Sequence, residues 1–143
     1  MAIFSKEITV EALNGLSGNT MTEHLGIVFT RVGPDFLEAQ MPVDSRTHQP
    51  MGLLHGGASV ALAETLGSVA ATCCVDMSKQ FCVGLEINAN HLRGVREGMV
   101  TGVTRPVHIG KKTQVWEIRI TNQKEELVCI SRITLAVLER TTQ

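Results

Sequence analysis

The stretch that most constrains the fold is residues 53–71, LLHGGASVALAETLGSVAA. From residue 57 to about 75 its pattern predicts the one long helix of the chain, because apolar residues recur there at helical spacing. That apolar stripe consists of Leu62, Leu66, Val69 and Cys73. Alanines and other small residues fill most remaining positions. We therefore expect close packing on all sides of this helix, with other elements wrapped around it.

Short strand-like segments surround the helix in the sequence. A short amphipathic helix at 8–16 comes first, followed by strands at about 25–31 and 36–43 and a loop at 44–57. Four strands follow the long helix, at 81–92, 99–109, 113–121 and 127–138. Short turns join these strands, and consecutive strands with tight turns pair antiparallel. The pattern predicts an α+β fold, in which one antiparallel sheet curls around one helix in a single domain spanning 1–143.

The composition excludes several functional classes. The net charge is −1, no basic run is present and aromatic residues are few, which argues against nucleic-acid binding. No apolar run reaches the roughly 18 residues that a membrane helix requires. The first residues, MAIFSKEITVEAL, lack a signal sequence, so we expect a cytoplasmic protein. The four cysteines lack metal-type spacing, and we expect small buried hydrophobes and no metal site.

One carboxylate, Glu64, stands in the middle of the apolar helix. Burial of an uncompensated charge costs several kcal/mol, so its presence needs a reason. Thr65 is also polar, and Ser68 lies four residues on, which places it on the same helical face as Glu64. A solvated helix edge is the ordinary explanation, but few polar residues flank Glu64. The alternative is a functional carboxylate.

His55, Gly56 and Gly57 stand where the helix begins. The first turn of a helix has unpaired N–H groups and a partial positive charge, which can polarise a carbonyl or stabilise an oxyanion. The simpler explanation is a glycine-rich helix start with a histidine beside its cap, and HGG alone is a weak signal. Gln49 is either a second positioning group or an exposed loop amide.

The spacing along the helix restricts how these residues can act together. Glu64 lies nine residues beyond His55, roughly 13 Å along the axis. Within one chain it therefore cannot act on a carbonyl held at Gly56. If both serve one substrate, they come from two chains with antiparallel helices, as a two-fold dimer provides.

A second polar cluster occurs later in the chain. His91 and Arg93 follow one strand, and His108, Lys111 and Lys112 surround a glycine turn. On two neighbouring strand ends, these groups could hold phosphates. An ordinary solvated turn is the alternative.

These segments carry a family resemblance that covers almost the whole chain. PVDSRTHQPMGLLHGG, GLLHGGASVALAETLGSVA and VGLEINANH are similar to the hotdog-fold thioesterases of the PaaI type. Within that group the chain resembles bacterial 1,4-dihydroxy-2-naphthoyl-CoA hydrolases and the proofreading thioesterases of enterobactin synthesis. The resemblance implies a hotdog fold and a homodimer, or a homotetramer of two dimers, with active sites across the dimer interface.

The resemblance also implies roles for individual residues. Glu64 would be the catalytic carboxylate, as nucleophile or as general base. Gly56 N–H would polarise the thioester carbonyl, with Gln49 and His55 positioning the thioester. Thr65 and Ser68 would help to hold substrate or water. The residues matching the CoA-contacting positions are Gly84, His91, Leu92, Arg93, Gly94, His108, Ile109, Gly110, Lys111, Lys112 and Thr113.

The implied reaction is hydrolysis of an acyl-CoA thioester with an aromatic acyl group, in menaquinone biosynthesis. It needs no metal and no separate cofactor, since CoA is part of the substrate. Three alternatives stay open at this point: a thioesterase acting on aryl carrier-protein thioesters, a hotdog hydratase or dehydratase, and a non-catalytic acyl-CoA binder.

Overall fold

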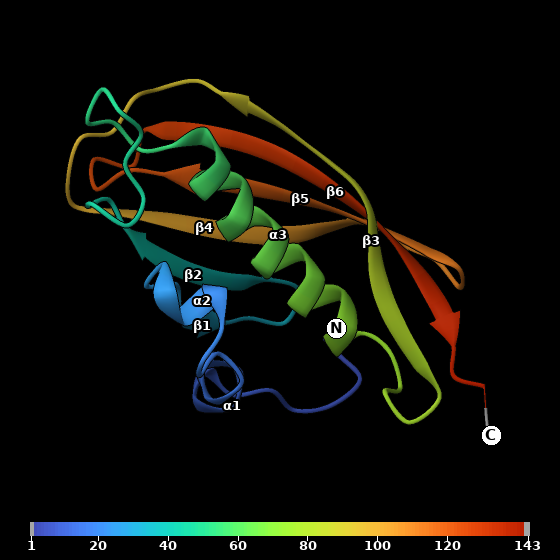
Figure 1. The fold of residues 1–143 in the computed structure, drawn as a ribbon. Coiled ribbons are helices and arrows are strands. Elements are labelled where there is room, and N and C mark those ends of the chain that lie inside the picture. Colours follow the sequence, from blue (N-terminus) through green and yellow to red (C-terminus); the bar gives the residue numbers. More distant parts are fainter. Residues whose placement is uncertain (1, 142–143) are drawn as a thin grey trace.

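The computed structural model describes residues 2–141 and contains three helices and six strands in that range (Figure 1). In chain order they are α1 (Val10–Gly15), α2 (Met21–His24), β1 (Val28–Val32), β2 (Leu37–Pro42), α3 (Gly56–Cys73), β3 (Gln80–His91), β4 (Met99–Ile109), β5 (Thr113–Thr121) and β6 (Leu127–Glu139). The expected helices and strands are confirmed to within a few residues. The sequence did not predict α2, because its four residues are too short for a helical period.

The strands form one antiparallel sheet in the order β1-β2-β4-β5-β6-β3. The expectation that consecutive strands pair is wrong for β3 and β4. Instead, β3 pairs with β6 at the far edge, with Gln80 opposite Glu139 and His91 opposite Cys129. Residues 92–98 join β3 to β4 without regular structure, and they carry the chain across the end of the sheet rather than through a tight turn (Figure 1).

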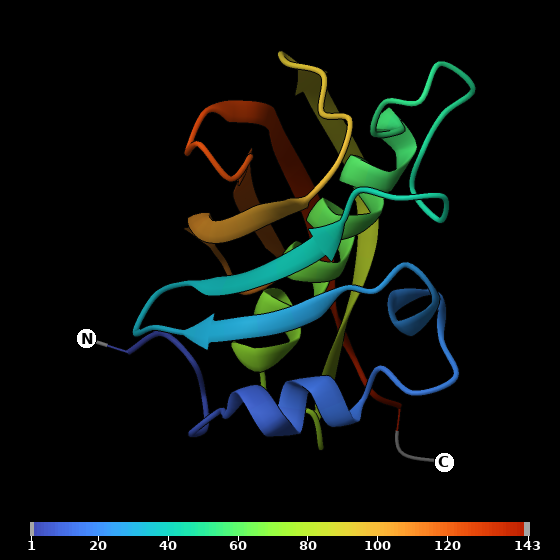
Figure 2. The same cartoon turned by 90° about the vertical axis from the view of Figure 1, so that its left-hand side faces the viewer.

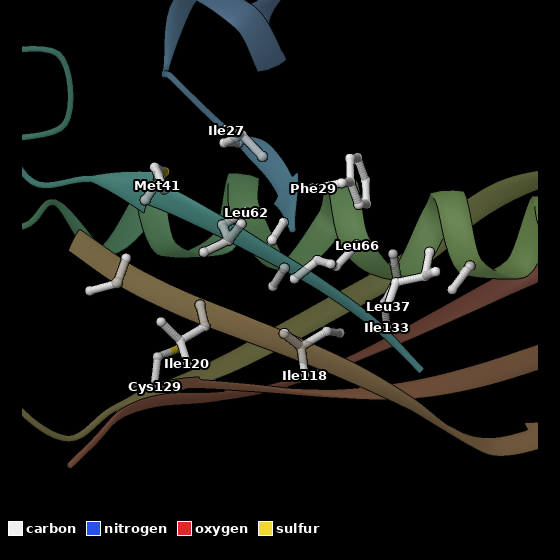
Figure 3. Close-up of a cluster of buried hydrophobic side chains, with 14 of the residues drawn as sticks. Ile27, Phe29, Leu37, Met41, Leu62, Leu66, Ile118, Ile120, Cys129 and Ile133 are labelled. Carbon is white, nitrogen blue, oxygen red and sulfur yellow. The ribbon is translucent and has the colours of Figure 1, made fainter. Parts of the chain in front are cut away.

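The long helix α3 lies against one face of the curved sheet, and the core forms between them. Figure 3 shows Leu62 and Leu66 of α3 in this layer with Ile118, Ile120 and Ile133 of the sheet. The small residues of α3 allow a close approach, since a Cβ at Gly67 would collide with Ile133. The buried residues of α3 are Ala58, Ser59, Leu62, Ala63, Leu66, Gly67, Ala70 and Ala71. Val69 and Cys73 of the expected stripe are only half-buried.

The side chains of β5 alternate between the core and the other face of the sheet. Gln114, Trp116, Ile118 and Ile120 all face the core and are fully buried. The two polar groups of this face satisfy each other: Trp116 Nε1 donates to Gln114 Oε1 at 2.9 Å, and Gln114 Nε2 donates to the carbonyl of Ala71 in α3 at 3.5 Å. These bonds tie β5 to the helix.

One side of α3 stays open in the single chain, so the expectation of a helix wrapped on all sides is wrong here. The half-exposed residues Ala61, Glu64, Thr65 and Ser68 lie on that side. Figure 2 shows β1 and β2 in front of the helix, with α1 below it. The opposite sheet edge is β3, whose outer side pairs with no strand among residues 2–141. An open helix face thus lies beside an open strand edge.

Candidate active site

The start of α3 leaves one backbone donor free. His55 is the N-cap, and its Nδ1 accepts from Gly57 N–H at 2.8 Å. Its carbonyl accepts from Ala58 N–H at 2.9 Å and from Ser59 N–H at 3.2 Å. Gly56 N–H makes no hydrogen bond within the described chain. Because the helix dipole adds partial positive charge there, Gly56 N–H is a preformed donor for a carbonyl oxygen.

A pocket of about 400 Å³ opens beside this helix start. It brings together six of the residues that the sequence singled out: Gln49, Gly56, His91, Leu92, Arg93 and Gly94. The other lining residues are Leu53, Leu54, Ser59 and Val128. Ser59 did not emerge from the sequence. The signal available was its place three residues after Gly56, on the same face of the helix.

His55 itself does not line this pocket. The sequence left open whether it caps the helix or positions a substrate, and the structure gives it the capping contact. Its backbone N–H also donates to the carbonyl of Thr47 at 2.8 Å, which fixes the loop before the helix. Nδ1 accepts a hydrogen bond, so the ring proton of the neutral form lies on Nε2.

Two chain segments form the walls of the pocket. One is the loop 44–55 and the other is the segment 91–98. They are joined by Leu54 N–H, which donates to the carbonyl of Val95 at 2.7 Å, and by His48 Nε2, which lies 2.8 Å from the carbonyl oxygen of Arg96. Leu92 N–H anchors the second wall to Val128 of β6 at 2.8 Å. The pocket is therefore held by main-chain bonds and one histidine side chain.

Gln49 and His91 both line the pocket with polar side chains. The Oε1 of Gln49 accepts from the N–H of Met51, so its Nε2 amide group remains for a ligand. The His91 ring lies over the helix start, because a Cβ built on Gly56 would be 2.9 Å from His91 Nε2. Glycine at position 56 thus allows both the ring and a ligand to approach the backbone.

Arg93 lies at the mouth of the pocket in an ion pair with Glu126, at 3.6 Å. Both side chains are about half exposed. The pKa of Glu126 is lowered mainly by the hydrogen bond from the Asn122 side chain, with a smaller effect of the Arg93 and Lys124 charges. A phosphate at Arg93 would compete with the Glu126 carboxylate.

Glu64 lies outside this pocket. It is eight residues beyond Gly56 in an unbroken helix, about 12 Å along the axis. Its side chain is half-buried on the open face, beside β3, because a Cβ at Gly84 would be 2.9 Å from Glu64 Oε1. The Thr65 hydroxyl donates to the carbonyl of Ala61 at 2.7 Å, and Ser68 lies on the same face as Glu64. The carboxylate forms no hydrogen bond or ion pair with residues 2–141.

The turn from His108 to Thr113 lies at the end of the sheet that carries Gly84 and Glu64, and not at the end that carries Arg93. The strand register aligns Ile109 with Gln114, Gln114 with Leu135, and Leu135 with Gly84. His91, at the end of β3, pairs with Cys129 at the other end of β6. The expectation that the two basic clusters share neighbouring strand ends is wrong, because β3 and β4 run in opposite directions and their C-terminal ends therefore lie at opposite ends of the sheet.

Two backbone hydrogen bonds hold that turn. Gly110 N–H donates to the carbonyl of Thr113 at 2.9 Å, and Val137 N–H donates to the carbonyl of Lys112 at 2.8 Å. Lys111 and Lys112 are exposed. Within one chain the expected site residues therefore lie in two separate regions: the pocket at Gly56, and the end of the sheet that holds Gly84 beside Glu64 and the 108–113 turn.

None of the four cysteines lines the pocket. Cys129 is buried, and Cys73, Cys74 and Cys82 are half-buried. Burial raises the pKa of Cys73 to about 11 and that of Cys74 to about 12, which keeps both thiols protonated near neutral pH.

Between residues 2 and 141 no three His, Cys, Asp or Glu side chains gather as metal ligands. No helix in that range is long and apolar enough to span a membrane.

Comparison with known proteins shows the family of this chain. The thioesterase superfamily matches residues 51–129, more than half of the chain. The chain is 55% identical to the 1,4-dihydroxy-2-naphthoyl-CoA hydrolase of Escherichia coli over 95% of this chain and 99% of that one. It is 54% identical to the proofreading thioesterase EntH of Cronobacter sakazakii, over 95% and 98%.

Solved structures agree with the sequence relatives. A mutant thioesterase from Pseudomonas aeruginosa superposes with a TM-score of 0.96 at 50% identity, covering 97% of this chain and 100% of that one. A thioesterase from Haemophilus influenzae gives a TM-score of 0.93, also at 50% identity, with coverage of 96% and 95%. With this sheet, this central helix and these relatives, the chain belongs to the thioesterase superfamily and is a hotdog-fold thioester hydrolase.

Proposed function

We propose that the chain hydrolyses acyl-CoA thioesters that carry an aromatic acyl group, 1,4-dihydroxy-2-naphthoyl-CoA among them, to the free acid and CoA. The observation that carries this proposal is the unpaired Gly56 N–H in a pocket that also holds Gln49, His91 and Arg93. The E. coli relative at 55% identity supports the substrate class. A cytoplasmic location and a place in menaquinone biosynthesis are part of the same proposal.

The chemistry follows from the donors present. The thioester carbonyl oxygen accepts from Gly56 N–H, and negative charge on that oxygen in the transition state is stabilised by the helix start. Gln49 holds the same end of the substrate through its free amide group. A thiolate is a good leaving group, so no strong acid is required. The reaction uses no metal and no cofactor beyond the CoA that the substrate itself carries.

The carboxylate that completes the site comes from a second copy of the chain. A 12-residue edge strand such as β3 presents unpaired backbone groups that favour pairing. If two β3 strands pair antiparallel about a two-fold axis near their middle, the strand end that carries Gly84 in one chain lies beside the end that carries His91 in the other. Glu64, beside Gly84, then faces the other chain's pocket, and each homodimer contains two equivalent sites. Two such dimers would give the homotetramer.

In this arrangement Glu64 attacks the thioester carbonyl or removes a proton from the attacking water. Thr65 and Ser68 hold substrate or water beside it. The 108–113 turn of one chain and Arg93 of the other contact the CoA phosphates from two sides. The Gly56 pocket and the Glu64 carboxylate of one chain thus act on two different substrate molecules.

Cleavage of a panel of thioesters by wild type and Glu64→Ala tests the function. We expect direct ultraviolet loss of the thioester to be fast with benzoyl-CoA and 1,4-dihydroxy-2-naphthoyl-CoA and slower with hexanoyl-CoA. Glu64→Ala should lose turnover while keeping its thermal melting temperature. Near-normal turnover by Glu64→Ala would remove Glu64 from the mechanism, and failure to cleave any CoA ester would contradict the proposed reaction.

A second candidate function is hydrolysis of an aryl thioester on a carrier protein. It is favoured by the EntH relative, whose 54% identity is practically equal to that of the CoA hydrolase. The same acyl group presented on CoA and on a carrier protein separates the two candidates. A kcat/KM at least tenfold higher for the carrier-protein ester would favour the second function; the reverse would favour the first.

A further inference from the structure

Ser59 is a buried polar residue in the pocket that the mechanism above does not use. It is only 1% exposed, and it lines the same pocket as Gly56. Its hydroxyl makes no hydrogen bond with residues 2–141, and no fully enclosed side-chain polar atom in that range lacks a partner. The Ser59 hydroxyl is therefore accessible from the pocket rather than sealed in the core.

The neighbouring helix residues show why this hydroxyl is free. The Thr65 and Thr72 hydroxyls of α3 each donate to the carbonyl four residues back, at 2.7 and 2.8 Å. For Ser59 that carbonyl belongs to His55, which already accepts from two backbone N–H groups. A carbonyl oxygen has two lone pairs, so no acceptor site remains there for the Ser59 hydroxyl.

The direction of the side chain places the hydroxyl near Gly56. Residues three apart share a helical face, and side chains on a helix lean toward its N-terminus. Ser59 is three residues after Gly56, so its hydroxyl leans toward the free Gly56 N–H. Two unpaired donors thus converge on one pocket at the positive end of α3.

We propose that the Ser59 hydroxyl is a second hydrogen-bond donor to the thioester carbonyl oxygen, beside Gly56 N–H. This inference rests on the proposed function of the pocket. The hydroxyl strengthens its hydrogen bond as the carbonyl oxygen gains negative charge, so Ser59 is a catalytic residue that acts mainly in the transition state. It keeps its proton throughout, and no bond to Ser59 forms or breaks.

Ser59→Ala and Ser59→Cys test the proposal, since cysteine keeps the size of the side chain but is a weak donor. With benzoyl-CoA we expect both variants to lose roughly 10- to 100-fold in kcat with little change in KM. Thr72→Ala is the matched control, because it removes a bonded hydroxyl from the same helix, and it should keep wild-type kcat. Melting temperatures are measured for every variant.

A second readout does not depend on turnover. Phenacyl-CoA, a ketone that cannot be hydrolysed, is bound to each protein and its carbonyl stretch is measured by infrared difference spectroscopy. A lost donor should shift this band to higher frequency in both Ser59 variants and not in Thr72→Ala. An unchanged band, or wild-type kcat in Ser59→Cys, would overturn the proposal even if Ser59→Ala were unstable.

The failure of this inference can be told apart from failure of the function. If wild type cleaves benzoyl-CoA while both Ser59 variants match it in kcat and in the carbonyl band, only the role of Ser59 is wrong. If wild type neither cleaves benzoyl-CoA nor binds phenacyl-CoA, the proposed function is wrong, and the role of Ser59 is wrong with it.

Discussion

At the scale of single residues, two glycines leave space for functional side chains. A Cβ at Gly56 would be 2.9 Å from the His91 ring, and a Cβ at Gly84 would be 2.9 Å from the Glu64 carboxylate. Both glycines occupy positions where the backbone passes directly beside a side chain of the proposed site. Substitution at either position should therefore alter activity more than stability.

The first prediction concerns the free N–H of Gly56. Proline is tolerated at the first position of a helix, and His55 before it already has the extended conformation that proline requires, with φ −67° and ψ 129°. Gly56→Pro removes the N–H, whereas the control Gly56→Ala adds a Cβ and keeps it. We expect kcat for benzoyl-CoA to fall at least about 100-fold further in Gly56→Pro than in Gly56→Ala. Equal kcat values in the two variants would contradict the role of this N–H.

The second prediction concerns Gly84. The Cβ of Gly84→Ala must displace Glu64 Oε1, which is the end of a flexible side chain, so the cost in stability is small. We expect roughly tenfold or greater loss of kcat with a change in unfolding free energy of less than about 1 kcal/mol. Gly15→Ala, where nothing lies within 4 Å of the added Cβ, is the control. Wild-type kcat in Gly84→Ala would mean that the position of Glu64 does not matter.

At the scale of elements, the pocket lies between two connecting segments, each of which adjoins a helix or a strand. The loop 44–55 leads into α3, and the segment 91–98 leads out of β3 (Figure 1). Between these two walls, within residues 2–141, the side-chain hydrogen bond is that of His48 to the carbonyl of Arg96. The acceptor is a carbonyl, so His48 Nε2 carries the proton and donates.

The third prediction follows from that bond. His48→Ala removes it and leaves the main-chain bond from Leu54 to Val95 in place. The wall that carries Arg93 becomes looser, so KM for benzoyl-CoA should rise about 2- to 10-fold while kcat stays within about twofold. His48→Gln keeps a donor and should recover part of the loss, and His24→Ala, on exposed α2, should behave as wild type. A fall in kcat alone would contradict a role in substrate binding.

The sequence predicted the helices and strands themselves better than it predicted which strands pair. The helix and β5 were predictable because their apolar residues repeat with helical and strand periods. The place of β3 was not, because residues 92–98 have no pattern that shows to which edge the chain crosses. The expected place of the His108–Thr113 turn beside Arg93 was wrong for another reason: β3 and β4 run in opposite directions, so their C-terminal ends lie at opposite ends of the sheet. Ser59 was missed because a serine among alanines gives no signal until the bonding of His55 is known.

At the scale of the whole molecule, one chain holds both parts of the proposed active site but keeps them apart. The Gly56 pocket and the Glu64 group lie about 12 Å apart along a rigid helix. Between them run the open face of α3 and the unpaired edge of β3. The two-fold dimer that we propose through that edge would cover both open surfaces and join each pocket to a carboxylate. The catalytic unit is then the dimer, and a monomeric chain should be inactive.

Mixed dimers test this central claim most directly. Glu64→Ala and Gly56→Pro chains, each inactive alone, are unfolded together and refolded in equal amounts. Random refolding makes about half of the dimers mixed. If the two chains share each site, a mixed dimer has one site with an intact pocket and an intact carboxylate, and one site with both defects. About a quarter of all sites are then intact, so activity should return to about a quarter of wild type. If each site lay within a single chain, every site would keep one defect. In that case the mixture would be as inactive as its components, and the account would be wrong.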